Sequence, residues 1–540
     1  MVSRETRGPG SPVGSGGAGG TVTGTLTRGL WVAGPPFVAI LALALAWPTL
    51  LPGVGFWDTA EFQTVPPLLG TLHPTGFPAY AILGWLASVL LQPFGAPAYR
   101  MNILSALCVA SAAGVTVILV RQLTGRVAIA IAAGIVLFLT PIAWKIATHA
   151  DAHAFHLLLL AIVFALLVGW ESRVRAADGP LPGADRWLVV AAGAYGVAVA
   201  NHSLALLAAP GIGLFVLAVE PGILSRVGLV ARCVGAGLGI AALLYLELPL
   251  RAGPFPAPLV YGHPETLAGF AYVVFGQQFH GDLASPLRDL GPRLGSLADF
   301  AVAQLGNLAA LVPLAGLVVV VRRWRYALLT IPTFVITCAF AVLYENADIT
   351  RYYLGPLLIA LTWVAILADG LLRLIGAVLS DSRARAQGDA PGAALGVLAL
   401  EVAVAAVFVA PAGLAAGATA RTVDESRDTA AAHWVDTTLA ALAPNAVVIS
   451  WWSYSTPLWY ARDVQGRRPD ITIIDDRTRL DQDLGDVSSV IDRYLGQRPV
   501  YLIRLPAETD VLAQSYRLLP IPDVMDSGLV QVIGRQVAGS

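Results

Sequence analysis

Long apolar runs occupy most of this 540-residue chain up to residue 415 and limit the folds that it can form. Only 13% of its residues are charged, against roughly 25% in a typical soluble protein. The sequence therefore predicts an α-helical polytopic membrane protein with about eleven transmembrane helices. We expect these spans near 31–50, 102–120, 127–146, 154–170, 187–203, 204–220, 228–248, 300–321, 326–343, 353–374 and 394–415.

Arginine clusters between the runs predict the orientation in the plasma (inner) membrane. Residues 1–28 are rich in Gly and Ser and predict a disordered cytosolic tail, which is followed by a transmembrane domain over 29–418. A further apolar run, 77–92, would place the later arginine clusters outside if it crossed the membrane, so we expect a juxtamembrane helix there. All short clusters then face the cytosol, as the positive-inside rule requires: Arg121 and Arg126, Arg173 to Arg186, Arg226 and Arg232, Arg322 to Arg325, and Arg373 to Arg385.

The same threading gathers the polar residues on the external face. All histidines except His433 fall there, in the first external loop 51–101, at helix ends, and in the long external loop 249–299. Charge so close to hydrocarbon is costly and indicates a functional site. The polar groups at this face are Asp58, Glu61 and His73, then His149, Asp151, His153 and His156, then Asn201 and His202, and finally Asp348, Arg351 and Tyr352.

Residues 430–540 differ in character from the rest of the chain. Short β-type runs at 446–451, 470–475, 500–503 and 529–533 alternate with helix-like stretches near 433–443, 455–464 and 486–497. This pattern predicts a small C-terminal α/β domain, external in this topology. Its aromatic pairs either stack on a sugar ring or pack the domain onto the membrane surface, and packing is favoured: Trp451-Trp452 and Trp459-Tyr460.

The external motifs resemble those of membrane glycosyltransferases of the GT-C fold. Asp58 and Glu61 are followed by His73-Pro74-Thr75-Gly76-Phe77-Pro78 and then by Tyr99-Arg100-Met101; more weakly, Gly466 to Asp470 resembles an element of the same family. The resemblance is greatest to the bacterial relatives of protein O-mannosyltransferases that act on plexin-type receptors. It implies a polyprenyl-phosphate monosaccharide donor, mannose by analogy, and inverting transfer on the extracytoplasmic side without a required metal.

By this resemblance Asp58 falls at the position of the catalytic acid, beside Trp57. Glu61 departs from the family pattern, in which the two acids are adjacent, so which of them acts as base stays open. A carboxylate base would take the proton of an acceptor hydroxyl, and apolar surroundings would raise its pKa. The alternative is structural, because Asp58 and Glu61 have the spacing of a helix-capping box.

The leaving phosphate requires cations. Arg351, beside Tyr352, is the strongest candidate because a guanidinium binds two phosphate oxygens at once, and Arg100 is a weaker one. Both arginines could instead extend along the membrane interface. His73 is expected to orient the loop or to bind the donor phosphate, unless it caps the juxtamembrane helix.

The remaining polar groups are expected to line the acceptor or donor pocket. His149, Asp151 and His153 have a spacing that metal ligands also show, so a divalent cation is an alternative, although we expect none. The pocket residues predicted with them are Trp57, Asn201, His202 and Asp348.

Other classes of function are less compatible with the sequence. A net charge of −1 gives no basic surface for nucleic acid. A transporter or flippase of lipid-linked sugar would place its acids at mid-depth and often repeats its halves, and a non-catalytic scaffold would act through the C-terminal domain. The acceptor stays open: the hydroxyl of a secreted protein's Ser or Thr, an envelope glycan, or a lipid.

Overall fold

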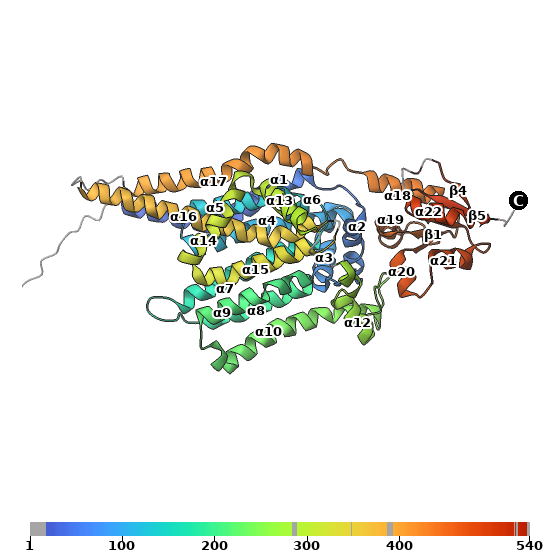
Figure 1. The fold of residues 1–540 in the computed structure, drawn as a ribbon, viewed down its shortest axis with the longest axis horizontal. Coiled ribbons are helices and arrows are strands. Elements are labelled where there is room, and N and C mark those ends of the chain that lie inside the picture. Colours follow the sequence, from blue (N-terminus) through green and yellow to red (C-terminus); the bar gives the residue numbers. More distant parts are fainter. Residues whose placement is uncertain are drawn as a thin grey trace, which may run out of the picture.

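The structure is a computed structural model that describes residues 18–282, 289–346, 348–385, 393–522, 524 and 528–536. A bundle of long helices is followed by a small sheet domain at one end of the bundle (Figure 1). The first helix, α1 (Ala18–Ala46), begins inside the segment 1–28 that the sequence predicts as a tail. Residues 1–17 of that segment lie outside the described residues.

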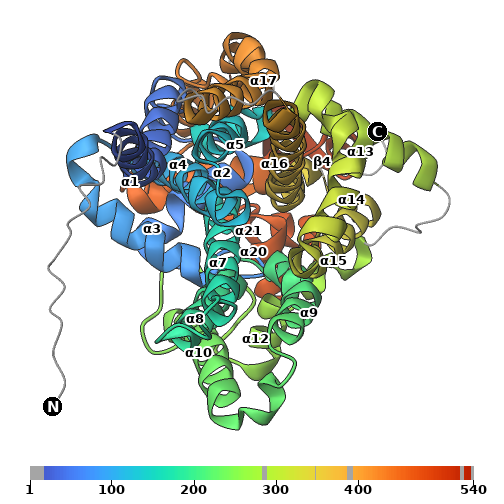
Figure 2. The same cartoon turned by 90° about the vertical axis from the view of Figure 1, so that its left-hand side faces the viewer.

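Every apolar run predicted from the sequence is helical. The helices of the bundle run close to the long axis of the molecule, as the view down that axis shows (Figure 2). They are α1, α4 (Pro97–Thr124), α5 (Val127–Leu139), α6 (Pro141–Thr148), α7 (Ala152–Val174), α8 (Ala184–Asn201), α9 (Ala209–Val219), α10 (Val227–Tyr245), α13 (Leu290–Leu305), α14 (Val312–Arg322), α15 (Trp324–Leu343), α16 (Leu354–Arg385) and α17 (Ala393–Val423).

The structure contains fewer spans than predicted when its helices are judged by length and composition alone. Within the described part of the chain, eight helices are long and apolar enough to cross a membrane, or nine if α5 and α6, bent by 62°, form one span. The prediction of about eleven also counted α8 and the segment Ser203–Val219. The second is shorter than a usual span, and α8 contains Asp185, Arg186 and Asn201, which lower its hydropathy.

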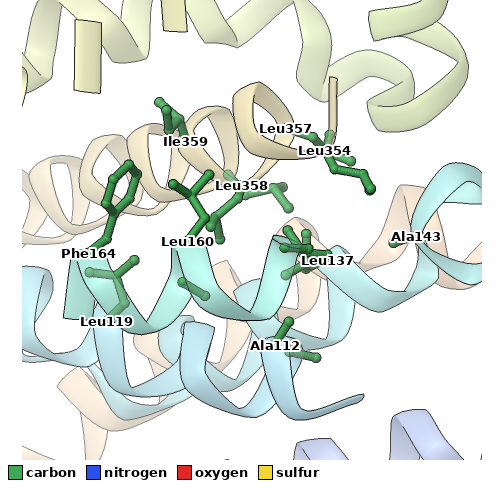
Figure 3. Packing of buried hydrophobic residues seen from close by; sticks show 14 of the residues in the cluster. Ala112, Leu119, Leu137, Ala143, Leu160, Phe164, Leu354, Leu357, Leu358 and Ile359 are labelled. Atoms are coloured by element: carbon green, nitrogen blue, oxygen red, sulfur yellow. The ribbon is translucent and has the colours of Figure 1, made fainter. Parts of the chain in front are cut away.

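The core of the bundle lies where α4, α5, α7 and α16 meet (Figure 3). Its side chains are aliphatic, aromatic or small and are withdrawn from solvent, so these four helices form the rigid centre on which the polar end is built. The buried residues at this centre include Ala112, Leu119, Leu137, Leu160, Phe164, Leu354, Leu358 and Ile359.

Small residues allow the outer helices to approach one another closely. A Cβ atom at Gly196 of α8 would lie 2.2 Å from the carbonyl oxygen of Gly237 in α10. Only glycine fits at that distance, as is common where transmembrane helices pack backbone to backbone. The close contact fixes α10 against α8 without requiring a hydrophobic driving force between them.

The first loop is a compact structure at the end of the bundle that faces the sheet domain (Figure 1). It contains α2 (Trp57–Thr64) and α3 (Pro78–Leu90). At 13 residues α3 is about 20 Å long, shorter than the ~30 Å hydrocarbon core, which agrees with a juxtamembrane helix in the predicted run 77–92.

The long loop predicted over 249–299 also contains helices. It includes α11 (Glu247–Ala252), α12 (Leu267–Val274) and a 3₁₀ segment, Gln277–Asp282, and ends in α13. Residues 283–288 of this loop lie outside the described part. Figure 1 shows α12 at the same end of the bundle as α2.

The C-terminal domain contains a mixed five-stranded sheet in the order β2-β1-β3-β5-β4. Strands β1 (Val447–Ser450), β2 (Thr472–Ile474) and β3 (Val500–Ile503) are parallel, as the alternation of strand and helix predicts, whereas β4 (Tyr516–Pro520) and β5 (Val530–Arg535) pair antiparallel. The sequence did not predict β4, most of whose residues are exposed. The helices of this domain are α18 (Ala430–Ala441), α19 (Trp452–Trp459), α20 (Asp476–Asp481), α21 (Val487–Tyr494) and α22 (Pro506–Ala513).

Aromatic residues of α19 and the π-helical turn after it join this domain to the first loop. The rings of Trp57 and Trp451 meet edge to face with centroids 5.0 Å apart. The backbone N–H of Ala98 donates to the Tyr460 hydroxyl over 3.2 Å, and both Trp459 and Tyr460 are buried. These aromatic side chains pack the domain onto the first loop, whereas the favoured alternative, packing onto the membrane surface, stays a prediction.

Candidate active site

Asp58 lies at the junction between the bundle and the sheet domain. It is in the first turn of α2, and its two carboxylate oxygens have different partners. One accepts from the guanidinium Nη2 of Arg351 over 2.7 Å, and the other accepts from the indole Nε1 of Trp452 over 2.8 Å. Three distant segments of the chain therefore meet at this one side chain.

The pKa of the Asp58 carboxyl reflects two opposing effects. Burial disfavours its charged form, but the charges of His73 and Arg351, with the two hydrogen bonds, outweigh burial and hold the pKa well below its usual value. Asp58 is therefore ionised at neutral pH. This differs from the sequence-based expectation that apolar surroundings raise the pKa of the base.

Glu61 is fully buried and faces His73. One of its oxygens accepts from the backbone N–H of His73 over 2.8 Å, and the other pairs with Nδ1 of the same ring. The capping alternative is wrong, because the N-cap of α2 is Phe56 and no side chain caps the helix. Both acids instead bond to other segments, Asp58 to Arg351 and Trp452 and Glu61 to His73.

Arg351 connects Asp58 to a second acid, Asp151. Its Nη1 lies 3.2 Å from Asp151, and its Nε lies 3.9 Å from Asp348. Asp151 caps α7 by accepting from the backbone N–H of His153, and it also bonds to the His153 ring over 2.8 Å. One arginine is thus shared by three carboxylates.

Histidine and tyrosine rings continue the site from Asp151 toward α8. The His153 ring stacks on Tyr352 with centroids 5.3 Å apart, and His202 meets His153 edge to face at 4.7 Å. Nε2 of His153 and Nδ1 of His156 are buried without a hydrogen-bond partner within the described residues. Such groups are costly to leave unpaired, so they point to a ligand or water in this region.

Two cavities meet at Asp58. The larger, about 530 Å³, is lined mainly by apolar groups together with polar side chains of the first loop, the bundle and the C-terminal domain. The smaller, about 400 Å³, is more polar and contains Lys145, His149 and Glu425. Both cavities are lined by Asp58, Asp348 and Arg351.

The smaller cavity contains an ion pair at its edge. Nδ1 of His149 lies 3.0 Å from a Glu425 oxygen, and Glu425 follows the last long helix. Burial alone would lower the pKa of His149, but the carboxylate of Glu425 raises it above its ordinary value. Burial would conversely raise the pKa of Glu425, and His149 lowers it.

One group of side chains has the geometry of a metal site. The ligand atoms of Asp58, Glu61 and His73 lie within 4.8 Å of one another. His149, Asp151 and His153, whose spacing also suggested metal ligands, form no such group within the described part of the chain; their partners are Glu425, Arg351 and each other.

The other predicted residues divide into those near the cavities and those away from them. Trp57 lines the smaller cavity, and His73, His153, His202 and Tyr352 line the larger one. Arg100 lies away from both, since it donates to the carbonyl groups of Ser88 and Gly95. Asn201 is buried behind the site, where its amide donates to the Ala152 carbonyl.

Sequence analysis missed two residues of the site, Trp452 and Arg477. The Arg477 guanidinium carbon lies 3.8 Å from the Trp452 ring centroid, and both side chains line the larger cavity. Trp452 was considered only as a packing or sugar-stacking residue. Arg477 gave no signal, because the C-terminal domain contains many arginines and its place beside Asp58 depends on how the domain docks.

Comparisons with known proteins identify similar sequences and folds. The family described as "Protein O-mannosyl-transferase TMEM260 N-terminal domain" matches residues 58–221, a range that begins at Asp58 and includes Asp151. The mouse "Protein O-mannosyl-transferase TMEM260" is 30% identical over 280 residues, which is 50% of this chain and 36% of that protein. The chain therefore spans about a third of the length of this relative.

Solved structures match nearly the whole chain. ArnT from Cupriavidus metallidurans bound to undecaprenyl phosphate has a TM-score of 0.57 at 16% identity and covers 97% of this chain and 99% of that one. The chain has the GT-C fold and is similar in sequence to a protein O-mannosyltransferase. The Archaeoglobus fulgidus oligosaccharyltransferase tethered with an acceptor peptide has a TM-score of 0.53 at 12% identity, covering 90% of this GT-C chain and 73% of that structure. Together with the long apolar helices, these similarities show that the chain is a multi-pass membrane protein.

Proposed function

We propose that this GT-C chain is a glycosyltransferase that moves a monosaccharide from a polyprenyl-phosphate donor to an acceptor hydroxyl. Mannose is the sugar suggested by the O-mannosyltransferase relative. The observation that carries the proposal is the meeting of two cavities at Asp58, a carboxylate held by a cation from the bundle and an indole from the C-terminal domain.

The larger cavity suits the donor. Leu206, Phe275 and Phe340 give it an apolar side, and the first two are strongly exposed on the surface of the molecule. A polyprenyl chain can lie along such side chains while its phosphate and sugar reach the polar end beside Asp58. The ArnT structure with the same fold was determined with undecaprenyl phosphate, which agrees with this assignment.

The smaller cavity suits the acceptor. It is polar and is bordered by Trp57 and Thr59 of the first loop, by Lys145 and His149, and by Glu425. An acceptor hydroxyl entering there would reach Asp58 from the side away from the donor cavity. A backside approach of this kind inverts the configuration at the anomeric carbon.

In the proposed reaction the acceptor oxygen forms a bond to the anomeric carbon as the bond from that carbon to the phosphate oxygen breaks. The electron pair of the broken bond leaves with polyprenyl phosphate, and the acceptor proton passes to Asp58. Each carboxylate oxygen retains a second lone pair beside its hydrogen bond to Arg351 or Trp452, so Asp58 can still accept the hydroxyl proton. Because its pKa is low, Asp58 acts mainly by orienting the hydroxyl and stabilising the positive charge that develops on the attacking oxygen.

Glu61 has a supporting role in this proposal. Both of its oxygens bind His73, and it lines neither cavity. It would fix His73 at the edge of the donor cavity, and Asp151 would fix Arg351 in the same way. The proposed reaction uses no metal, and the guanidinium groups of Arg351 and Arg477 line the donor cavity.

The site and the C-terminal domain are proposed to lie on the extracytoplasmic side of the plasma (inner) membrane. Arg126, Arg322 and Arg373 lie together around Asp369, far from the site along the bundle, and the positive-inside rule assigns that end to the cytosol. In this arrangement residues 29–418 form the transmembrane unit and residues 430–540 the external domain. The acceptor would be a secreted protein or an envelope glycan.

The decisive experiment replaces Asp58 by Asn. Purified protein in nanodiscs would be given radiolabelled polyprenyl-phosphate mannose and a panel of acceptors, and we expect the variant to lose about 100- to 10,000-fold in transfer rate. Asp178→Asn, which removes an exposed acid in the loop before α8, is the matched control. Transfer by Asp58→Asn at the wild-type rate would exclude Asp58 as the base.

A further inference from the structure

The two arginines that line the larger cavity differ in how their charge is balanced. Arg351 is paired with Asp58, Asp151 and Asp348, so its cluster carries more negative than positive charge. Arg477 forms no salt bridge with a carboxylate within the described residues, and its Nη1 is buried without a hydrogen-bond partner there. The unbalanced cation of the cavity is therefore Arg477.

The position of Arg477 is fixed by its neighbours. It lies in the first turn of α20, which is capped by Asp475 through a hydrogen bond from the Thr478 backbone. The guanidinium carbon lies 3.8 Å from the Trp452 ring centroid and 5.5 Å from that of Tyr261. Two aromatic rings thus hold the guanidinium by cation–π contacts and leave its Nη1 available to donate.

Trp452 connects Arg477 to Asp58. The same indole that lies against the Arg477 guanidinium donates its N–H to the Asp58 carboxylate over 2.8 Å. A phosphate bound by Arg477 would consequently lie about one indole width from Asp58. A monosaccharide attached to that phosphate can bridge such a distance and present its anomeric carbon to the carboxylate.

Nearby carboxylates would repel an anion at Arg351 more strongly than an anion at Arg477. The three carboxylates around Arg351 lie within 4.0 Å of its guanidinium, and two of them accept hydrogen bonds from it. A phosphate there would have to displace one of them or be repelled by the others. At Arg477 it would instead complete the hydrogen bonding of a buried donor, which removes an energetic cost.

We propose that Arg477 of the C-terminal domain binds the donor phosphate, and that Arg351 positions Asp58 and does not act as the phosphate anchor. This assignment rests on the proposed function, which supplies the identity of the phosphate. It differs from the sequence-based expectation for Arg351, and it makes the C-terminal domain a part of the donor site. The apolar residues of the same cavity favour a lipid phosphate over a free one.

The proposal is tested by lipid binding, measured separately from transfer. The full-length protein in detergent would be titrated with undecaprenyl phosphate, with undecaprenol and with inorganic phosphate by native mass spectrometry. We expect Arg477→Gln to weaken binding of undecaprenyl phosphate about 10- to 100-fold, because a charge-assisted hydrogen bond to a buried anion is lost. Undecaprenol should bind wild type and variant equally, and inorganic phosphate should bind both weakly.

Two further variants separate the roles of the arginines. Arg351→Gln should bind undecaprenyl phosphate nearly as wild type does while losing transfer. Arg493→Gln removes an exposed arginine of α21 in the same domain and should change neither. Arg477→Lys, which keeps the charge but not the planar fork, should bind with intermediate affinity and decides the question if Arg477→Gln fails to fold.

The outcomes distinguish this inference from the proposed function. If wild type binds and transfers but Arg477→Gln binds equally well, or if Arg351→Gln loses the lipid instead, the phosphate assignment is wrong and the enzyme assignment stands. If inorganic phosphate competes as strongly as the lipid phosphate, the site takes a free anion. If wild type binds no undecaprenyl phosphate, both proposals fail.

Discussion

The two ends of the helical bundle hold charged clusters of opposite composition. At one end Asp369, itself buried, is approached by three arginines, with 3.1 Å to Arg126, 3.5 Å to Arg322 and 2.8 Å to Arg373. At the other end Arg351 is approached by Asp58, Asp151 and Asp348. Roughly 25 Å of helical segment separates the two central residues.

The difference lies in what surrounds each cluster. The cluster around Asp369 joins α16 to the beginning of α5 and the end of α14, and its residues line none of the cavities described above. The cluster around Arg351 lines both cavities. Similar ion pairs thus hold the bundle together at one end and, in our proposal, orient reactive groups at the other. Substitutions at the two ends should separate stability from activity.

The largest expected effect is the contrast between Asp58→Asn and Asp369→Asn. The first should lose about 100- to 10,000-fold in transfer with little change in melting temperature. The second should cost about 2 kcal/mol of stability, below the 3–5 kcal/mol of a fully buried pair because its arginines are partly exposed, and should retain the specific activity of the folded fraction. Thermal melts and transfer assays on the same preparations measure both. Loss of activity in folded Asp369→Asn would contradict the assignment of stability to one end of the bundle and of activity to the other.

The next largest effect is expected from Arg351→Gln, which should reduce both the stability of the protein and its transfer activity. Removing this guanidinium leaves Asp58 and the buried Asp151 without their shared cation, at a cost of about 3 kcal/mol. Transfer should fall because Asp58 is no longer oriented. Arg351→Lys should recover more stability than activity, since one ammonium cannot hold two carboxylates in the same geometry. Equal recovery of both would indicate that charge alone is required.

A smaller, pH-dependent effect is expected from Glu425→Gln at the smaller cavity, which we propose takes the acceptor. The pKa of His149 is raised from 6.5, so its contribution to stability is present at low pH and is lost as the pH rises through the folded-state pKa. The pKa of Glu425 is lowered from 4.5, so its contribution to stability is present at higher pH and is lost as the pH falls through the folded-state pKa. The pair therefore stabilises most between about pH 4.5 and 6.5. The difference in melting temperature between wild type and Glu425→Gln should be largest there and shrink toward pH 8.5. A constant difference would show that the pair is not ionised.

The smallest expected effect is that of a chelator. Asp58, Glu61 and His73 have the geometry to bind a cation, yet each already has a protein partner. We expect transfer to continue in EDTA and added Mn²⁺ to leave the rate unchanged. Loss of transfer in EDTA that is restored by Mn²⁺ would instead assign a metal to this group.

The sequence predicted the membrane fold and the external acids because both follow from local patterns. Apolar runs and arginine clusters identified the helices, and the charge beside Trp57 identified the first loop. The spacing of Asp58 and Glu61 alone could not show which of them acts as the base, because that depends on which side chain faces His73 and which faces Arg351. The pKa of Asp58 was expected to rise because burial was visible in the sequence and the nearby cations were not.

The contribution of the C-terminal domain could not be predicted for a different reason. Trp452 reaches Asp58 across 394 residues of sequence, and Arg477 enters the cavity only through the docking of α19 and α20. Nothing in the local sequence of this domain distinguishes these two residues from its other tryptophans and arginines. The missed strand β4 has the same origin, since its residues are mostly exposed and take their partners from β5.

The hydrogen bond between Trp452 and Asp58 also has a consequence for biosynthesis. Asp58 is synthesised after α1 and before the other helices of the bundle, whereas its indole partner is synthesised only after α17. One oxygen of Asp58 lacks its donor until that late stretch has been translated and has folded against the first loop. A polypeptide stalled or truncated between α17 and α19 would insert its helices normally and still contain an unfinished site. Completion of the proposed reactive centre is thereby coupled to translation and folding of the C-terminal domain.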